Sequence, residues 1–431
     1  MIANARISSI LRPRRSTLLT HRIRLFATTA AKAVNDRPVW VLTDGGIQST
    51  LSGMALGKRL GHVELKTVAV NKGLQVFPPI VQKYLVDWFL QRRQDNRKAP
   101  WYLTLKEGEW GDSKPDFVIC SAPDAVPACL SVSKNNPTTY SVYVGYPNIP
   151  FLYFDQVVLP KYEMDAKLAK LGPFYSKQKN SIATQVPLLD LENGHERYLQ
   201  PILPASFLAG GNGATTSSHN MVAVIIGGYT PQCRWYSEDA SSLADNMQRM
   251  VKKLHAKIVV VFTEKTTAEV KTTIKQMCSH QADSIAIWDA MADTETSLTR
   301  AQIYQSIIDK ASRVVVTADL DYAVAHAAAK RKPVYVAFGD RCRQHLLRFH
   351  RWARDNRITR KLRLDRGRGA SRKQQQQQQH HPLYDPYSYL GNHGPWANGH
   401  QLVENEAALE HVQYEVTELR QERVTGKRRK D

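Results

Sequence analysis

The clearest pattern lies between Met221 and Arg354, where short apolar runs alternate with segments whose apolar residues recur at helical spacing. Runs of β-branched residues favour buried strands, and apolar residues three and four positions apart favour helices that cover a sheet. Strands are predicted at 221–226, 257–263, 284–288, 313–316 and 334–338. Helices are predicted at 237–254, 303–310, 320–330 and 340–355. A further helix follows the strand 257–263 and ends at about residue 280. We therefore predict a Rossmann-like α/β domain over residues 221–360.

The amino half repeats this alternation less regularly. Strands are predicted at 38–42, 63–70, 116–120, 140–144 and 155–159, and helices include 79–92 and 124–133. We place this second α/β domain at residues 37–175. Residues 176–220 form a predicted connector, because 209–218 is rich in Gly, Ser and Thr. The expected fold class is α/β, with two Rossmann-like domains that face a cleft.

The two ends of the chain have a different composition from the domains. Residues 1–33 contain six arginines, one lysine and no acid, which is typical of a mitochondrial presequence. Residues 361–400 form a basic, low-complexity insertion with a poly-Gln run at 374–379, and we expect it to be disordered. Residues 401–424 regain helical spacing, with Leu402, Leu409, Val412, Val416 and Leu419 as the apolar stripe. A basic tail, 425–431, closes the chain.

Length and hydropathy bound the class of protein. The 431 residues, of which 42% are hydrophobic, suffice for two packed cores. Every apolar run is interrupted by a charge long before the roughly 20 residues that a membrane-spanning helix needs. We therefore predict no transmembrane segment, so any association with a membrane is peripheral.

The formal net charge of +20 is concentrated near the ends and in the block from Arg341 to Lys373. Such blocks bind phosphates of RNA or anionic lipid headgroups, but they also occur as solvated helix faces and basic linkers. No nucleic-acid motif accompanies the charge, and both interpretations stay open.

The five cysteines are scattered, without the close pairs that hold zinc, and no metal site is predicted. We expect reduced, buried thiols, as the apolar neighbours of Cys120 and Cys129 indicate. Cys233 differs because it follows a predicted strand and precedes a helix, whose N-terminus can lower a thiol pKa. No histidine lies beside it in the sequence, which argues against a nucleophile.

Candidate ligand-facing residues follow directly after predicted strands, because parallel strands end at the same edge of a sheet. In a functional interpretation, Gly227 and Gly228 let a ligand approach the backbone and Arg234 binds a phosphate. In a structural interpretation, the glycines form a tight turn, Asp44 and Asp319 cap helices, and Arg234 pairs with one of these aspartates. No acid–base or nucleophile–base pair can be placed, so no catalytic residue is assigned. The candidates are Thr43, Asp44, Gly45, Gly227, Gly228, Thr230, Arg234, Thr317 and Asp319.

Short motifs run through both halves. They are Leu-Thr-Asp-Gly at 42–45, Phe154-Asp155 with Pro160, Gly227-Gly228 with Thr230, Cys233 and Arg234, Trp288-Asp289, Val-Thr-Ala-Asp at 316–319, Lys-Pro-Val at 332–334, and Cys342-Arg343 with Phe349-His350. In order and spacing they resemble the mitochondrial fission family known from the plant "elongated mitochondria" factor and its bacterial relatives. That family is related in fold to glycosyltransferases of the two-domain GT-B type. The resemblance covers about residues 38–360 and resumes near 396–416, so the glutamine tract looks like an insertion.

The chain departs from the family pattern at positions where a nucleotide-sugar diphosphate would bind. A serine and a glutamate of the family are replaced by Leu320 and His326, and a basic loop is replaced by residues 263–267. Ala122-Pro123 stands where the family has Gly-Arg, and the glycine-rich loop after Asp44 is shorter. The resemblance therefore implies a glycosyltransferase-like scaffold whose transferase chemistry is lost.

The resemblance also implies a role in mitochondrial division and morphology. In the plant relatives, that role is to bring dynamin-related GTPases to the outer surface of mitochondria. The basic amino end predicts import instead, which conflicts with a partner in the cytosol. We predict a mitochondrial, non-catalytic scaffold without a cofactor.

Two alternatives follow from the same residues. One is an enzyme that transfers a sugar from a bound nucleotide sugar, which requires Gly227, Gly228, Arg234 and Asp319 to line a pocket open to both domains. The other is a mitochondrial protein that binds RNA or anionic lipid through a contiguous basic face at 341–373.

Overall fold

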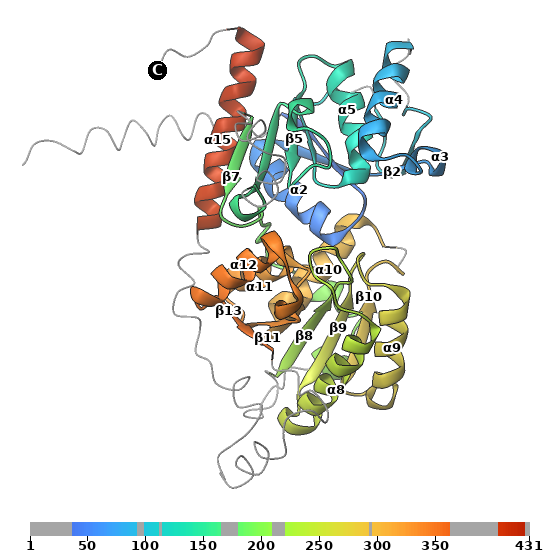
Figure 1. The fold of residues 1–431 in the computed structure, drawn as a ribbon, viewed down its shortest axis with the longest axis vertical. Helices are drawn as coiled ribbons and strands as arrows, with labels where there is room; N and C mark the ends of the chain where they lie inside the picture. The colour runs from blue at the N-terminus through green and yellow to red at the C-terminus, as the bar shows by residue number, and fades with distance from the viewer. Residues whose placement is uncertain are drawn as a thin grey trace, which may run out of the picture.

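Two α/β domains lie one above the other along the long axis of the molecule (Figure 1). The computed structural model describes residues 37–92, 99–111, 114–164, 180–208, 220–292, 295–362 and 404–426. Four predictions concern residues outside these ranges: the presequence at 1–33, the Gly/Ser/Thr-rich loop at 209–218, the low-complexity insertion at 361–400 and the basic tail at 425–431. Only residues 361–362 of the insertion and 425–426 of the tail are described. The predicted fold class, two α/β domains that share a cleft, is confirmed.

The first domain contains a seven-stranded sheet in the order β3-β2-β1-β4-β5-β6-β7. All neighbouring strands are parallel except β2 and β3, which are antiparallel. The strands are β1 Pro38–Thr43, β2 His62–Val70, β3 Leu103–Glu107, β4 Phe117–Cys120, β5 Tyr140–Val144, β6 Gln156–Pro160 and β7 Ser181–Thr184. The helices are α2 Ile47–Leu60, α3 Lys72–Gln75, α4 Pro79–Arg92 and α5 Val126–Asn135, with 3₁₀ turns η1 Pro123–Ala125 and η2 Phe151–Tyr153.

The second domain contains a fully parallel six-stranded sheet in the order β10-β9-β8-β11-β12-β13. Its strands are β8 Met221–Ile226, β9 Lys257–Phe262, β10 Ile285–Asp289, β11 Arg313–Thr317, β12 Val334–Ala337 and β13 Thr359–Lys361. Its helices are α8 Ser237–Leu254, α9 Ala268–Cys278, α10 Ser297–Lys310, α11 Asp321–Ala329 and α12 Gln344–Asp355, with η5 Ser279–Gln281 and η6 Gly339–Arg341. The short elements η4 Glu196–Tyr198 and α7 Ala205–Leu208 precede β8.

Three strands lie where the sequence interpretation placed none. The strand β7 falls in the predicted connector 176–220, yet it pairs with β6 and belongs to the first sheet. The strands β3 and β13 lie at the outer edges of their sheets, and Thr359–Lys361 overlaps the start of the predicted low-complexity insertion at 361. All three are short, and β3 and β13 have exposed residues, so they lack the long apolar run by which buried strands are recognised. The helix α8 begins at Ser237, as predicted, and Tyr236 is its N-cap.

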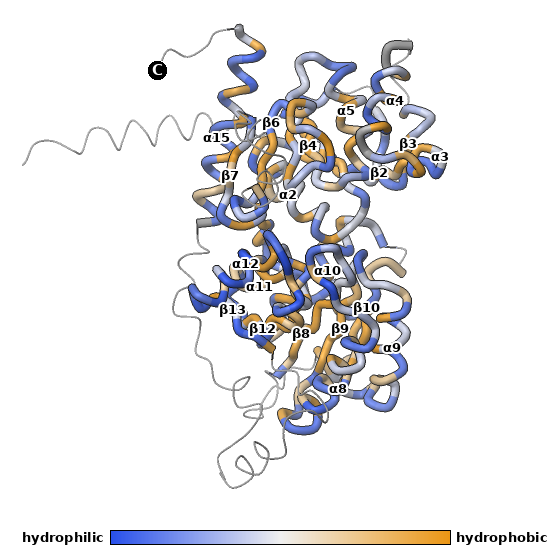
Figure 2. Tube along the Cα trace, in the orientation of Figure 1, coloured by the Kyte–Doolittle hydropathy of each residue, from blue (hydrophilic) through white to orange (hydrophobic). Residues whose placement is uncertain are grey.

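The carboxyl-terminal helix α15, Glu404–Thr425, returns to the first domain, beside which it runs in Figure 1. Leu409, Val412 and Val416 are buried and complete a core with the strands of the first sheet. Asn405 exchanges two hydrogen bonds of 3.1 Å with the backbone of Leu189. The predicted apolar stripe therefore packs as expected, while Leu402 lies outside the described residues. Figure 2 shows the most apolar segments in the sheets and blue, polar segments on the outer helices.

Candidate functional site

The turn after β1 lies against the second domain. The hydroxyl of Thr43 is buried and contacts the hydroxyls of Ser49 and Thr50 at 2.9 and 3.0 Å. One carboxylate oxygen of Asp44 accepts hydrogen bonds from the backbone N–H of Gly46 at 2.9 Å and from the Ser49 hydroxyl at 2.5 Å. These bonds hold the turn that precedes α2, but the N-cap of this helix is Gly46 and it has no side-chain cap, so the predicted capping role is wrong for Asp44.

Gly45 joins this turn to α10. Its backbone has φ 92°, a left-handed conformation that favours glycine. Its carbonyl oxygen accepts a hydrogen bond of 2.9 Å from Nη1 of Arg300. A side chain here would also meet the Ser297 hydroxyl, 3.1 Å from an added Cβ. The left-handed backbone favours a glycine at this position, and the close approach of Ser297 leaves little room for a side chain.

The turn after β8 is filled from within the protein. The N–H of Gly227 donates to the Thr317 hydroxyl at 2.8 Å, and the N–H of Gly228 donates to Oδ2 of Asp319 at 2.9 Å. A Cβ on Gly227 would lie 1.8 Å from Asp319, and one on Gly228 would lie 2.0 Å from the Lys265 carbonyl oxygen. The close approach that these glycines permit is made by the chain's own groups, in agreement with the structural interpretation.

Asp319 is buried beneath this turn, at 2% exposure. Its second carboxylate oxygen accepts a hydrogen bond of 2.9 Å from the indole N–H of Trp235, whose ring stacks on Phe338. Burial raises the pKa of Asp319, against the effect of the positive Lys265 and of its hydrogen bonds. The predicted capping role is wrong for this aspartate, because Leu320 is the N-cap of α11 and makes no side-chain cap. Its carboxylate holds the β8 turn instead.

Thr230 and Arg234 do not join the other candidates in the cleft. Thr230 closes a tight turn with Cys233, whose N–H lies 3.0 Å from the Thr230 hydroxyl. The side chain of Arg234 is exposed. The predicted pairing of Arg234 with Asp44 or Asp319 is not formed, because the partners of both carboxylates are backbone N–H groups, Ser49 and Trp235.

A cleft of about 380 Å³ separates the ends of the first sheet from the second domain. It is lined by the carboxylates of Asp44, Glu163, Glu264 and Asp321, whereas Lys265 is the one Lys or Arg in the lining within the part of the chain that the structure describes. The Tyr162 hydroxyl donates to Asp321 at 2.7 Å. Of the nine predicted residues, Asp44 lines this cleft and the other eight do not.

Sequence reasoning missed most of the lining. The other lining residues are Gln48, Ser49, Ser52, Ser121, Ala122, Pro123, Tyr143, Val144, Gly145, Tyr146, Val158, Leu159, Pro160, Thr184, Pro187 and Leu188. Thirteen of these sixteen lie at the carboxyl ends of β4, β5, β6 and β7 or in the segments after them, so the rule that ligands bind beyond the carboxyl ends of parallel strands gave the correct edge. It could not say how far each side chain reaches.

The positions that depart from the family pattern are filled by structural contacts. His326 is fully buried between the rings of Tyr304 and Tyr322, with Nε2 3.0 Å from the carbonyl oxygen of Asp190. Burial, aided by Lys330, lowers the pKa of His326 to about 4, so its ring is neutral at physiological pH.

The loop that replaces the family's basic segment is held by hydroxyl groups. Those of Thr263 and Thr266 both donate to the carbonyl oxygen of Ile226, at 3.0 and 2.5 Å. Thr267 caps α9 by accepting from the N–H of Val270. Burial raises the pKa of Glu264 in the same loop.

One chemically distinctive pair lies outside the predicted site. The Sγ atoms of Cys233 and Cys342, 109 residues apart in the sequence, lie 3.0 Å apart. The five cysteines are buried and free, in agreement with the prediction of reduced thiols. The sequence offered no histidine beside Cys233, and in the structure it is Cys342 that interacts with a histidine, His350, eight positions further along the chain.

Two features are absent from the described ranges. No group of three or more His, Cys, Asp or Glu side chains there is arranged to hold a metal ion. No helix within them has the length and apolarity needed to cross a membrane.

Several solved structures are similar to this chain. The UDP-GlcNAc 2-epimerase from Neisseria meningitidis, bound to UDP-GlcNAc, aligns with a TM-score of 0.44 and 11% identity, covering 89% of this chain and 100% of that one. A UDP-N-acetylglucosamine 2-epimerase described as putative, from Listeria monocytogenes, aligns with a TM-score of 0.44 and 10% identity over 88% and 97% of the two chains. Similarities at this level do not establish a shared activity.

Sequence comparisons are more specific. An uncharacterized protein of Rickettsia prowazekii is 21% identical over 316 residues, which covers 70% of this chain and 83% of that protein. The profile of the family described as "Mitochondrial fission ELM1" matches residues 48–386, which is well over half of the chain and includes both domains. The β1 turn, the Gly227-Gly228 turn and the Asp319 contact described above all lie in or directly beside the matched region. The chain therefore belongs to the mitochondrial fission ELM1 family.

Proposed function

We propose that this protein is a mitochondrial fission and morphology factor that acts as a non-catalytic scaffold. Its membership of the family supports the biological role. The charge of the cleft supports the absence of transferase chemistry. Among the described residues, four carboxylates line the cleft against a single lysine. A nucleotide diphosphate placed there would meet carboxylates that repel it, where a diphosphate site needs arginines, lysines or backbone N–H groups.

The β8 turn supports the same proposal. In the transferase alternative, Gly227, Gly228, Arg234 and Asp319 line a pocket shared by both domains. None of the four lines the cleft. Asp319 and the carbonyl group of Lys265 occupy the space over the two glycines, and the side chain of Arg234 is exposed elsewhere. The backbone N–H groups that would bind a phosphate already donate to Thr317 and Asp319.

The proposed role is exerted through the surface, by binding protein partners in mitochondrial division. By family resemblance, the partner class is a dynamin-related GTPase. The basic segments offer contacts to anionic lipid or RNA in addition. The proposed location is the mitochondrion. The composition of the amino-terminal segment favours import into the organelle rather than a position on its outer surface.

The first experiment separates a scaffold from an enzyme. The purified chain is tested with UDP, UDP-GlcNAc and other nucleotide sugars by thermal shift, followed by calorimetry. We expect no stabilisation by any of them. A shift with a nucleotide sugar that Lys265→Ala abolishes and Arg234→Ala leaves unchanged would contradict the scaffold and place a donor in the cleft.

The second experiment tests the role in morphology. Cells lacking the protein are expected to contain elongated mitochondria, which both the wild-type chain and the cleft variant Lys265→Ala restore to normal length. Normal morphology in cells without the protein would refute the role in fission. Failure of a stably folded Lys265→Ala chain to restore length would indicate that a ligand in the cleft is needed.

A further inference from the structure

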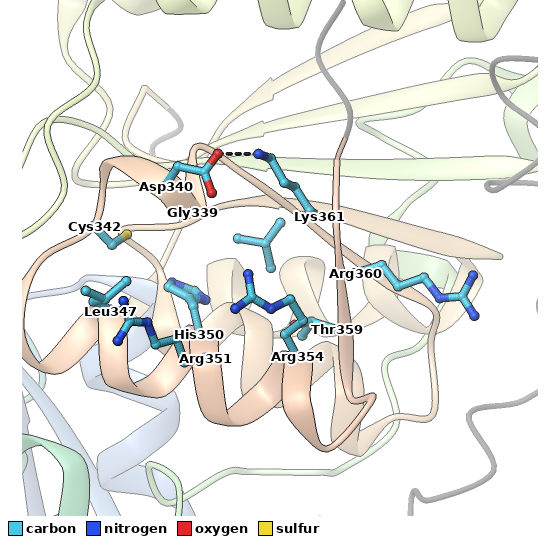
Figure 3. A pocket seen from close by; sticks show the side chains of 11 residues that line it. Gly339, Asp340, Cys342, Leu347, His350, Arg351, Arg354, Thr359, Arg360 and Lys361 are labelled. Carbon is cyan, nitrogen blue, oxygen red and sulfur yellow. Dashed lines mark hydrogen bonds and ion pairs between the residues drawn. The ribbon is translucent and has the colours of Figure 1, made fainter.

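A second pocket, in the second domain, shares no lining residue with the cleft (Figure 3). It has a volume of about 320 Å³ and lies between the end of β12, the turn η6, the helix α12 and the strand β13. Arg351, Arg354, Arg360 and Lys361 line it, and Asp340, which pairs with Lys361, is the single acid in this lining among the described residues. The pocket therefore has an excess of positive charge and suits an anionic ligand.

Cys342 lines this pocket and lies opposite Cys233. The two residues form an isolated antiparallel bridge, flanked by hydrogen bonds from Arg343 N–H to the Gln232 carbonyl at 2.7 Å and from Arg234 N–H to the Arg341 carbonyl at 3.4 Å. In such a pair the bridging bonds belong to the neighbours, and the two Cα atoms are typically about 4.5 Å apart. That separation falls within the range that a disulfide spans without backbone movement.

His350 lies on the same side of the pocket as Cys342, whereas Arg354 and Lys361 lie across from them and Arg360 points away (Figure 3). The Nε2 atom of His350 is 2.6 Å from the carbonyl oxygen of Ala318. A carbonyl oxygen can only accept a hydrogen bond, so Nε2 carries a proton. Its Nδ1 is buried and has no hydrogen-bond partner among the described residues. The ring is thereby oriented with one nitrogen free to exchange a proton.

The electrostatics of the pair distinguish the two thiols. A hydrogen bond from Cys233, assisted by His350, lowers the pKa of Cys342 to about 6, although burial and Asp319 oppose this. The same hydrogen bond and burial raise the pKa of Cys233 well above its ordinary value. Cys342 is thus the nucleophile of the pair and Cys233 the resolving thiol.

We propose that Cys342 and Cys233 form a thiol–disulfide exchange site for small disulfides that carry carboxylates, of which glutathione disulfide is the obvious example. The pocket supplies recognition, because arginine binds a carboxylate through two parallel hydrogen bonds. Arg351 and Arg354 are three residues apart on α12 and both line the pocket.

The exchange takes two steps. Nδ1 of His350 first takes the proton of the Cys342 thiol. The Cys342 thiolate attacks one sulfur of the bound disulfide; a bond forms between Cys342 and that glutathione, and the other glutathione leaves as a thiolate that takes this proton back from Nδ1 of His350. The Cys233 sulfur then attacks Sγ of Cys342 and displaces the second glutathione, which leaves with the Cys233 proton. Two protein thiols are oxidised to one disulfide, and one glutathione disulfide is reduced to two molecules of glutathione.

The test uses the reduced full-length chain, freed of reductant and exposed to glutathione disulfide, with disulfides mapped by mass spectrometry without reduction. We expect a Cys233–Cys342 disulfide in the wild-type protein and a glutathione adduct on Cys342 in Cys233→Ser. Cys278→Ser, which removes another buried thiol, serves as the control and should react like the wild type. Cys233 and Cys342 remaining reduced in the wild-type protein, or an adduct spread equally over the cysteines, would overturn the proposal.

The role of the pocket is tested separately. The double variant Arg351→Gln, Arg354→Gln should react roughly tenfold more slowly with glutathione disulfide, the loss expected for weakened charged hydrogen bonds. It should react with the uncharged hydroxyethyl disulfide at the wild-type rate. Arg348→Gln, an exposed arginine on the same helix that does not line this pocket, is the matched control. Equal slowing with both disulfides would show that the arginines do not recognise the anion.

Discussion

At the scale of single residues, the candidate site depends on which groups occupy the space beside two glycines. Gly227 and Asp319 are adjacent in space although 92 positions separate them in the sequence. The same carboxylate bonds to the N–H of Gly228 and to the indole of Trp235. A ligand could compete for these N–H groups only by displacing a buried, hydrogen-bonded carboxylate. This is why a glycine motif by itself does not identify a nucleotide site.

Gly227→Ala should destabilise the protein by about 2–3 kcal/mol, the upper range for overpacking. The added Cβ would lie 1.8 Å from Oδ2 of Asp319, so the carboxylate must move and lose its hydrogen bonds. The denaturant midpoint measures the effect. Gly73→Ala, where an added Cβ meets nothing within 4 Å, is the control and should be neutral or slightly stabilising. An unchanged midpoint for Gly227→Ala would contradict the proposed packing.

Cys342 should show an unusual dependence of alkylation rate on pH. Its pKa of about 6 lies below the ordinary thiol value because Cys233 and His350 stabilise the thiolate, whereas burial and the nearby Asp319 favour the thiol. The lowered pKa means that the thiolate persists above about pH 6 and is lost as the pH falls through that value. The rate of alkylation by iodoacetamide, followed at Cys342 by mass spectrometry, should therefore level off near pH 7. A rate that keeps rising to pH 9 would disprove the shift.

At the scale of secondary structure, the helix α15 shows how a remote segment completes a domain. Its apolar stripe packs on the first sheet, and Arg420 forms an ion pair of 2.6 Å with Asp116. The helix is separated from the rest of the described chain by residues 363–403, yet its docking site lies in the first domain rather than in the second, which precedes it. Sequence spacing predicted the helix and its buried face, but not the surface that receives it.

Val416→Ala should weaken the docking of α15 by about 2 kcal/mol, the cost expected for removing two buried methyl groups and leaving a cavity. Val416 is fully buried, whereas Val424 on the same helix is 53% exposed. Val424→Ala should therefore change stability by less than about 0.5 kcal/mol. Hydrogen exchange of the α15 amides reports the loss locally. Equal protection in the two variants would show that the helix is held by other contacts.

At the scale of the whole molecule, the two domains are joined by apolar packing of Ile47 and Leu51 of α2 into the core of the second domain and by polar contacts. Glu107, on the edge strand β3, accepts hydrogen bonds from the Ser297 N–H at 3.1 and 2.9 Å and from the Thr67 hydroxyl at 2.9 Å. Its carboxylate also lies 3.5 Å from Arg300. A negative charge at the N-terminus of α10 is favourable because the helix dipole is positive there. This contact ties the edge strand of the first domain to α10 of the second.

Glu107→Gln should cost about 1–2 kcal/mol of domain docking, because the neutral amide loses the charge-assisted bonds to the α10 N-terminus and Arg300. Small-angle scattering should show a larger radius of gyration, and the thermal midpoint should fall. The control is Glu109→Gln. Glu109 is exposed, and its hydrogen bond to Lys66 is made by the backbone carbonyl rather than the side chain. Identical scattering from the two variants would mean that docking does not depend on Glu107.

Much of the architecture was determined by the sequence itself. Buried parallel strands are continuous apolar runs, and covering helices repeat apolar residues every three or four positions, so ten of the thirteen strands and the main helices could be located along the chain. The short strands β3, β7 and β13 were not predicted, because they lack the continuous apolar run by which a buried strand is recognised. The edge of the sheets where a cleft forms also followed from the parallel topology.

The tertiary structure alone decided what occupies that edge. Whether Asp319 faces a ligand or the Gly228 N–H, whether Arg234 reaches the cleft, and whether Cys233 meets Cys342 depend on loop paths that bring distant residues within 3 Å. Residue type and spacing fix local conformation through backbone and packing preferences. Contacts between groups 90 or more positions apart, such as Gly227 with Thr317, are fixed only when the second domain has packed.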